Sequence, residues 1–303
     1  MKTSSVKSDL KVILSFAAIY MIWGTTYLAT KIGIEELPPF LMATMRYLVA
    51  ATALLGFCIV KKQRPGKLAI LRNMVLGALM LTLGQGILFW AQLHLSSGLT
   101  AVLASTLPIC YILVDRKNWK GYFHSKLTIS SILLGLAGII LLFLDQLSGG
   151  AGDGNMVLLV SLTVIFSCLC WAWGSIYYKQ HSTSDTLFPD VSLQLLGGAV
   201  ACFAVSISTE PLKDIDLYQV SFRTWVAVAY LAIAGSIIAF SALYFLLSVR
   251  PAAVVGTYAY INPIIAVLLG VMMAGEKISA IQILGIAVIL TGAYLSNRVK
   301  LKT

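Results

Sequence analysis

Apolar residues along this chain gather into long continuous runs that short polar segments separate. A run of about twenty apolar residues, at about 1.5 Å of helical rise each, crosses about 30 Å of hydrocarbon. The runs do not alternate with a period of two, so they favour a helical bundle over a membrane barrel. We predict an all-α membrane protein with ten transmembrane helices, at residues 12–30, 38–60, 73–93, 97–115, 126–144, 156–178, 187–207, 223–247, 252–273 and 279–297.

The sequence repeats itself at an interval of about 150 residues. The motif Trp-Gly-x-x-Tyr occupies residues 23–27 and returns at residues 173–177, and Pro108 in one late run is matched by Pro263 in another. Such self-similarity predicts two copies of a five-helix unit, residues 1–147 and 156–303, joined by a linker at residues 148–155. Because five is odd, the second copy enters the membrane from the opposite side. Many transporters build a midplane site from inverted repeats of this kind.

The composition excludes a water-soluble globule. Hydrophobic residues make up 59% of the chain and charged residues 11%, whereas soluble domains carry about a quarter charged residues. Lys and Arg accumulate in short cytoplasmic loops, and most of the 22 basic residues fall on one side if the N-terminus is inside. We predict that both termini are cytoplasmic. The net charge of +10 then reflects topology, and no basic stripe with interleaved aromatics supports a nucleic-acid partner.

The motifs of common enzymes are absent: there is no Walker loop, GxSxG elbow or HExxH. The cysteines are odd in number and lie inside apolar runs, so we interpret them as small buried side chains rather than disulfides or metal ligands. They are Cys58, Cys110, Cys168, Cys170 and Cys202. No metal and no cofactor is predicted. The basic N-terminus resembles a signal peptide, but its apolar run is too long and nine more follow, so it is interpreted as the first span.

Acidic residues avoid the middle of the predicted spans. Asp115, Asp190 and Glu276 all lie near span ends. Proton-coupled transporters often carry the proton on an intramembrane carboxylate. The sequence therefore disfavours that form of coupling.

Two aromatic pairs are candidates for the wall of a cavity. Trp23 and Tyr27 are four residues apart and share one helix face, as do Trp173 and Tyr177 in the second copy. We predict that the pseudo-symmetry brings both pairs to a common axis. The alternative is that these side chains contact lipid or form an interfacial aromatic belt.

Uncharged polar residues inside the apolar runs are candidates for the lining of the predicted cavity. Gln85 shares one helix face with Phe89 and Gln92, and Tyr258 shares one with Asn262. Polar groups within hydrocarbon normally face protein or water. We predict that Gln85, Tyr258 and Asn262 face the cavity, with hydrogen bonding between helices as the alternative.

Arg46 lies well inside the second predicted span. An arginine near the centre of a span costs about 2.5–3.5 kcal/mol to insert, so we expect it to face the protein interior. It is a candidate ligand for a substrate carboxylate or phosphate. The alternatives are hydrogen bonds to carbonyls of neighbouring helices, or a side chain that extends to the membrane surface.

Pro108 and Pro263 interrupt two apolar runs. Proline lacks a backbone donor and clashes with the preceding turn, so it frees carbonyls that a cavity or a side chain must satisfy. We predict that both prolines let their helices bend between two states. A static packing kink is the alternative.

Three segments together resemble the EamA-type family of the drug/metabolite transporter superfamily. They are WGTTYLATKIGIEELPPFLMATMRYLVAA at residues 23–51, MAGEKIS at 273–279 and LGIAVILTGAYL at 284–295. The resemblance implies a basket-like bundle in the bacterial inner membrane, with a cavity formed by the first four spans of each repeat and the fifth and tenth spans outside. It also implies export or exchange of amino acids, nucleosides and other small metabolites. Where the first copy would carry its own Gly-Glu, this chain has a basic segment at residues 116–120.

The predicted function is a secondary transporter that exports or exchanges a small-molecule substrate by alternating access around a central cavity in the lipid bilayer. A membrane-embedded enzyme is the first alternative, and it would need a convergent pair of titratable groups. A channel-like protein is the second, and it would show a polar stripe along an oligomer axis. The substrate, direction, energy coupling and oligomeric state stay open at this point.

Overall fold

The ten apolar runs fold as helices. The structure is a computed structural model that describes residues 2–63, 65–120, 124–148, 154–181, 187–250, 252–256, 258–275 and 278–297. In the first half of the chain the elements are α1 (Lys2–Gly33), α2 (Pro39–Val60), α3 (Lys67–Gly77), the π-helical η1 (Ala78–Gly86), α4 (Ile87–Ala91), α5 (Ser97–Ala104), α6 (Leu107–Val114), the short 3-10 turn η2 (Arg116–Asn118) and α8 (Lys126–Ser148).

The second half repeats this order. Its elements are α9 (Gly154–His181), α10 (Leu187–Thr209), the 3-10 turn η4 (Leu212–Asp214), α11 (Phe222–Tyr230), the π-helical η5 (Leu231–Ile238), α12 (Ala239–Val249), α13 (Ala252–Val255), α14 (Tyr258–Ala274) and α15 (Ala280–Asn297). No β-strand occurs in the residues that the structure describes. The prediction of an all-α membrane protein is confirmed at this level.

Seven helical stretches are long and apolar enough to cross a membrane. They are Leu10–Gly33, Pro39–Val60, Lys67–Ala91, Ser97–Val114, Asn155–His181, Leu187–Thr209 and Phe222–Val249. The other three predicted spans coincide with shorter apolar stretches at Lys126–Gly138, Tyr258–Met273 and Ala280–Gly292. Ten crossings in two inverted repeats therefore stay a prediction. Glu276, linker residues 149–153 and the C-terminal residues from 298 lie outside the described residues.

Two predicted spans are interrupted. The span predicted at 97–115 breaks at Ser105 and Thr106, between α5 and α6. The span predicted at 252–273 breaks between Val255 and Tyr258, where α13 ends and α14 begins. Apolar periodicity does not report such breaks, because the side chains on both sides of each break stay apolar.

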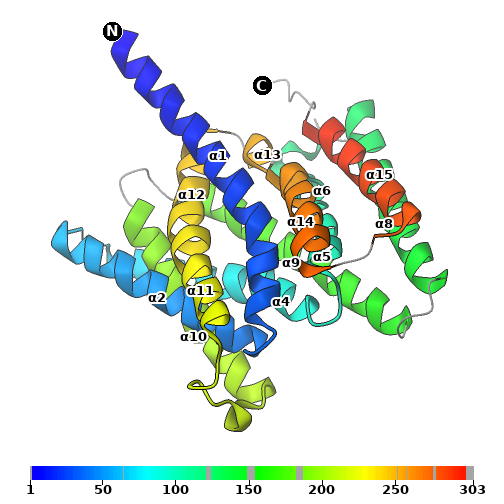
Figure 1. The fold of residues 1–303 in the computed structure, drawn as a ribbon. Coiled ribbons are helices and arrows are strands. Elements are labelled where there is room, and N and C mark those ends of the chain that lie inside the picture. The colour runs from blue at the N-terminus through cyan, green and yellow to red at the C-terminus, as the bar shows by residue number, and fades with distance from the viewer. Residues whose placement is uncertain are drawn as a thin grey trace.

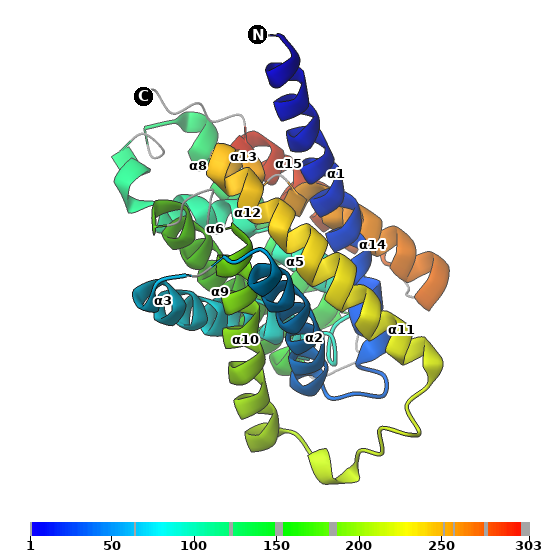
Figure 2. The same ribbon diagram turned by 90° about the vertical axis from the view of Figure 1, so that its left-hand side faces the viewer.

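Contacts that a helix of the first half makes with the second half recur between the corresponding helices with the halves exchanged. Helices α2 and α10 pack together, and α8 lies beside α15 at one edge of the bundle (Figure 1). Helix α1 packs against α14, and its counterpart α9 packs against α5 and α6. Helix α1 also runs along α11 and α12 (Figure 2), and α9 correspondingly contacts η1 and α4. A two-fold relation between the halves predicts this exchange of partners.

A carboxylate from the second half caps a helix of the first half. Helix α2 begins after Pro38, which offers no side-chain cap. The Glu210 carboxylate instead accepts hydrogen bonds from the backbone N–H groups of Phe40 at 2.7 Å and Leu41 at 3.0 Å. These donors would otherwise have no partner inside the helix, and a negative charge there complements the helix dipole. The cap ties the ends of α2 and α10 together.

A second carboxylate binds at the start of α11. The Glu36 carboxylate, which is exposed, accepts hydrogen bonds at 2.9 Å from both the backbone N–H and the hydroxyl of Ser221, the N-cap residue of α11. Nearby, Arg223 forms a 3.6 Å ion pair with Glu35. Hydrogen bonding with Thr224, followed by that with Ser221, holds the pKa of Glu36 below its ordinary value. The α1–α2 turn is thereby joined to the start of α11.

Glycines allow α3 and α10 to cross in backbone contact. A Cβ atom on Gly77 would lie 1.9 Å from the carbonyl oxygen of Gln194, and one on Gly197 would lie 2.1 Å from the carbonyl oxygen of Met74. Both contacts are with rigid backbone, so neither could yield. Small residues at such crossings are the usual route to close packing between helices in membranes.

We expect Gly197→Ala to lower the stability of the folded protein, because the added methyl group forces α3 and α10 apart. Overpacking of this kind costs about 1–3 kcal/mol. Thermal unfolding of the detergent-purified protein, followed by size-exclusion chromatography, measures the change. Gly56→Ala is the matched control, since a Cβ there meets nothing within 4 Å and the unfolding temperature should not fall.

We expect Glu36→Gln to reduce the acid sensitivity of the fold. A carboxyl group whose pKa is lowered by folding stabilises the protein above its unfolded pKa of about 4.3, and that stabilisation is lost as the pH falls through the lower folded value. Unfolding temperatures measured between about pH 6 and about pH 3 should therefore decline less steeply in Glu36→Gln than in the wild type. Parallel curves would contradict the role assigned to this carboxylate.

Candidate functional site

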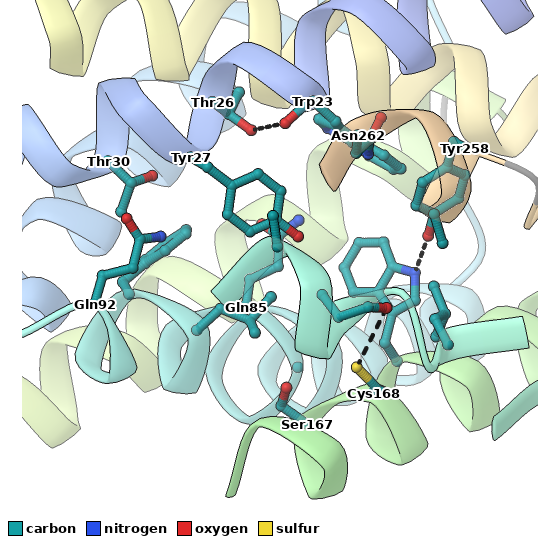
Figure 3. Close-up of a pocket in the computed structure, with 18 of the residues that line it drawn as sticks. Trp23, Thr26, Tyr27, Thr30, Gln85, Gln92, Ser167, Cys168, Tyr258 and Asn262 are labelled. Carbon is teal, nitrogen blue, oxygen red and sulfur yellow. Dashed lines mark hydrogen bonds between the residues drawn. The ribbon is translucent and has the colours of Figure 1, made fainter. Parts of the chain in front are cut away.

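A cavity opens between the two halves of the bundle. It holds about 710 Å³ of space, part of it open to solvent. The first half lines it from α1, α2, η1, α4, α5 and α6, and the second half from α9 and α14 (Figure 3). The lining residues are Trp23, Thr26, Tyr27, Thr30, Arg46, Gly84, Gln85, Leu88, Phe89, Gln92, Ala101, Ala104, Leu107, Ser167, Cys168, Trp171, Tyr258, Ala259 and Asn262.

Aromatic side chains from three helices form one wall. The Trp23 ring makes edge contacts with Trp171, at 5.8 Å between ring centroids, and with Tyr258, at 4.8 Å. The indole N–H of Trp171 donates to the Tyr258 hydroxyl at 3.0 Å. That of Trp23 donates to the carbonyl oxygen of Gly235 at 3.2 Å. With both indole donors satisfied, the rings present their apolar surfaces and hold one orientation.

Arg46 is the buried cation at the wall. Only 2% of its side chain is exposed. Its Nε–H donates to the Ser236 hydroxyl at 3.0 Å, and its guanidinium carbon lies 5.0 Å from the centroid of the Tyr47 ring and 5.3 Å from that of Phe89. Among the described residues no carboxylate forms an ion pair with it. Arginine presents five N–H donors, so the group keeps capacity to bind an anion.

Three amides add polar groups to the lining. The Tyr47 hydroxyl donates to Gln85 Oε1 at 2.8 Å, so Gln85 makes a hydrogen bond between helices and also lines the cavity. The Asn262 amide, oriented to satisfy its surroundings, donates to the carbonyl oxygens of Tyr20 at 3.0 Å and Tyr258 at 3.1 Å. Gln92 Oε1 is buried and has no hydrogen-bond partner. An unsatisfied acceptor beside a cavity can accept a hydrogen bond from an N–H or O–H group of a ligand.

One π-helical segment lines the cavity and the other binds two of the lining residues. η1 contributes Gly84 and Gln85 to the lining. η5 contains Gly235 and Ser236, which bind Trp23 and Arg46. The segments begin 153 residues apart, close to the repeat interval, at Ala78 and Leu231. Mid-helix π segments are rare and are found frequently at functional sites.

The predicted prolines differ in their local structure. Pro108 stands in the first turn of α6, directly after the break that follows α5. It cannot donate to the Ala104 carbonyl, which instead receives a weak 3.9 Å hydrogen bond from the Cys168 thiol. Pro263 lies inside α14, which continues through it. The break in the second half therefore precedes its proline by several residues, and bending at either proline stays a prediction.

Six predicted site residues line the cavity, namely Trp23, Tyr27, Arg46, Gln85, Tyr258 and Asn262, and Tyr27 projects into it from α1 (Figure 3). Their contact with a substrate stays a prediction. Trp173 and Tyr177 are not among the lining residues, and this placement corrects the sequence analysis. Trp173 is 47% exposed and stacks on Tyr177 at 5.2 Å, and Tyr177 stacks on His181 at 4.2 Å.

Trp171 occupies the place that the sequence assigned to Trp173. Two residues along an α-helix rotate a side chain by about 200°, so the two tryptophans point to opposite sides of α9. The sequence Trp171-Ala172-Trp173 contained both candidates. The Trp-Gly-x-x-Tyr motif selected the wrong one, because motif spacing does not report helix rotation. Within the described residues, no group of three or more His, Cys, Asp or Glu side chains could hold a metal ion.

The sequence and the fold of this chain are similar to those of known proteins. The profile of the EamA-like transporter family matches residues 10–144 and again residues 158–298. The Escherichia coli K12 protein named "Uncharacterized inner membrane transporter YedA" is 34% identical over 280 residues, which cover 92% of this chain and 88% of that protein.

More distant relatives extend the comparison. The "Probable amino-acid metabolite efflux pump" of E. coli K12 is 21% identical over 286 residues, covering 92% of each chain. "Protein PecM" of Dickeya dadantii is 25% identical over 281 residues, covering 92% of this chain and 90% of that one. A protein crystal structure superposes with a TM-score of 0.65 at 19% identity, covering 94% of this chain and 96% of that chain, and so shares the fold.

Proposed function

The chain belongs to the EamA-like transporter family and is a membrane transporter, and we propose that it exports or exchanges small metabolites across the cytoplasmic membrane by alternating access around the cavity described above. The observation that carries this proposal is the cavity itself, because both halves of the chain line it and a buried arginine stands at its wall. Sites at the interface of two related halves are typical of secondary transporters.

The matched contacts of the two halves support an inverted repeat. Helices exchange partners between the halves as a two-fold relation requires, and the family profile matches the chain twice. The two π-helical segments recur at nearly the repeat interval; η1 lines the cavity, and η5 binds the lining residues Trp23 and Arg46. In an inverted repeat, exchanging the conformations of the two halves turns an outward-open cavity into an inward-open one.

The cavity is positioned toward one end of the bundle. Its lining on α1 extends from Trp23 to Thr30, close to the end of that helix, and includes Gln92 just beyond α4. Basic residues concentrate at the opposite end, which carries the α2–α3 connection at residues 61–66. Since cytoplasmic loops collect Lys and Arg, the structure corresponds to an outward-facing state in this proposal.

Arg46 favours a substrate that carries an anionic group. Its guanidinium has no carboxylate partner among the described residues, and a buried cation without a counter-charge is costly. A substrate carboxylate would supply that charge, and the aromatic wall would pack against an apolar body. One relative, at 21% identity, is named a probable amino-acid metabolite efflux pump. Amino acids and nucleosides are therefore the first compounds to test, with carboxylates expected to bind better.

Counterflow into proteoliposomes tests the transport proposal. A panel of radiolabelled amino acids and nucleosides should reveal at least one compound whose uptake saturates and is accelerated by unlabelled compound inside. Trp23→Ala and Trp171→Ala should each lower its rate roughly tenfold through loss of the aromatic wall. Trp173→Ala is the matched control on the opposite side of α9 and should stay within about twofold of wild type.

Three outcomes would contradict this assignment. Full counterflow in both Trp23→Ala and Trp171→Ala would show that the cavity is not the substrate path. A product of altered mass would favour an enzyme. Flux that does not saturate would favour a channel.

Arg46→Gln should raise the KM for a transported carboxylate by about tenfold to a hundredfold, since a hydrogen bond to a charged group contributes about 1.5–3 kcal/mol. Arg46→Lys, which keeps the charge but not the planar fork, should show a smaller rise. The methyl ester of the same compound is the control substrate, and its transport should change little. An equal loss for acid and ester would show that Arg46 only supports the fold.

A further inference from the structure

A chain of buried polar side chains links three helices away from the cavity. Asn73 of α3 donates to Asp190 Oδ1 of α10 at 2.6 Å and accepts from the Gln194 amide at 2.9 Å. The Tyr244 hydroxyl of α12 donates to Gln194 Oε1. Each of the four side chains is at most 1% exposed. The sequence placed Asp190 near a span end, and the structure adds that its carboxylate is completely buried.

This polar chain joins the first half of the molecule to the second. Asn73 belongs to the first half, and Asp190, Gln194 and Tyr244 belong to the second. The four residues lie toward the end of the bundle that carries the α2–α3 connection, since Asn73 is in the second turn of α3 and Asp190 is in the first turn of α10. We call them the inner cluster. At the same end, Arg72 Nη1 donates to the carbonyl oxygen of His181 at 2.7 Å.

Aromatic rings fill the space between the cavity and the inner cluster. Trp171 at the cavity wall contacts Phe240 at 5.7 Å between ring centroids, and Phe240 contacts Tyr244 at 4.7 Å. Tyr178 packs on Tyr244 at 3.9 Å. Phe240 and Tyr244 are at most 2% exposed. We call Phe240, Tyr178 and Tyr244 the aromatic plug, so Tyr244 belongs to both the plug and the inner cluster.

Two helix contacts between the halves differ in how they are closed. The contact of α10 with α3 is sealed by backbone at Gly77 and Gly197, beside the inner cluster. The contact of α2 with η5 is bridged by Arg46 and Ser236, and Arg46 there faces the cavity. One end is thus closed by buried polar bonds and glycine packing, while the cavity occupies the other.

We propose that the inner cluster is a latch that keeps the cavity closed toward the α2–α3 connection and breaks when the transporter opens on that side. The proposal rests on the proposed function, because it assumes that the protein alternates between two open states. While the latch is closed, Asp190 and Gln194 depend on protein partners for their hydrogen bonds. Once α3 and α10 separate, water can take over those bonds, so polar residues at this contact permit a reversible opening that an entirely apolar seam would disfavour.

Two residues of the inner cluster, Asn73 and Tyr244, connect it to its surroundings. Asn73 bonds both Asp190 and Gln194, so it connects the two halves directly. Tyr244 connects the polar chain to the aromatic plug. Loss of either side chain should favour the state that is open toward the α2–α3 connection, although neither side chain would contact a substrate.

Accessibility of a cysteine in the cavity tests the latch. Thr26→Cys places a thiol of similar size at the half-buried lining residue Thr26. A membrane-impermeant methanethiosulfonate is applied to right-side-out and inverted vesicles, and mass spectrometry locates the label. With the latch intact, labelling should be fast from one face only. Adding Tyr244→Phe or Asn73→Ala should raise the rate from the α2–α3 face about tenfold, as expected for one lost hydrogen bond.

Two matched controls isolate the effect. Tyr111→Phe removes another buried tyrosine hydroxyl, one outside the inner cluster, and Glu210→Gln alters a carboxylate at the other end of α10. Neither should raise labelling from the α2–α3 face. Tyr244→Phe removes one oxygen atom only, and size-exclusion chromatography confirms that it folds.

The outcomes separate the latch from transport itself. Unchanged labelling in Tyr244→Phe and Asn73→Ala, or an equal rise from both faces, would overturn the latch even if wild-type counterflow is normal. Absence of counterflow for every compound in the wild type, with labelling that shifts as expected, would instead count against the proposed function.

Discussion

Hydrocarbon offers no hydrogen bonds, so every polar group inside this bundle must be satisfied by the protein or by what enters its cavity. The structure follows this constraint closely. The first free N–H groups of α2 are bound by Glu210 of the other half. The Asn262 amide binds two backbone carbonyls, and the Trp23 indole binds a third. Because the bonds of Glu210, of Trp23 and of Asn262 with Tyr20 connect residues far apart in the chain, satisfying polar groups also fastens the halves together.

Two departures from this rule lie at the cavity. Arg46 has one hydroxyl partner and two aromatic neighbours where a buried cation would ordinarily have a carboxylate. Gln92 keeps a buried oxygen without a donor. Both groups border one cavity. Polar capacity that the protein leaves unused in a dry interior is a cost to stability, and a bound substrate can recover it.

The two halves share a similar framework of helices but differ in the side chains at their contacts. Matched helix contacts and matched π-helical segments give the halves similar frameworks. The side chains at the contacts between the halves differ, with glycine and buried amides where α3 meets α10 and arginine where α2 meets η5. In the proposed transport cycle, a symmetric framework permits two exchanged states of similar energy, and the different side chains at the two contacts bias which state is populated.

The sequence by itself determined the apolar spans, the internal repeat and six of the cavity-lining residues, because membrane thickness and helical periodicity act directly on residue type. It also identified Arg46 as interior, since lipid would reject a charge. Only the tertiary structure decided that Trp171 and not Trp173 faces the cavity, that Ser236 is the partner of Arg46, and that Asp190 is buried against Asn73. These features depend on the rotation of each helix about its axis and on contacts between residues more than a hundred positions apart, which local patterns in the chain do not encode.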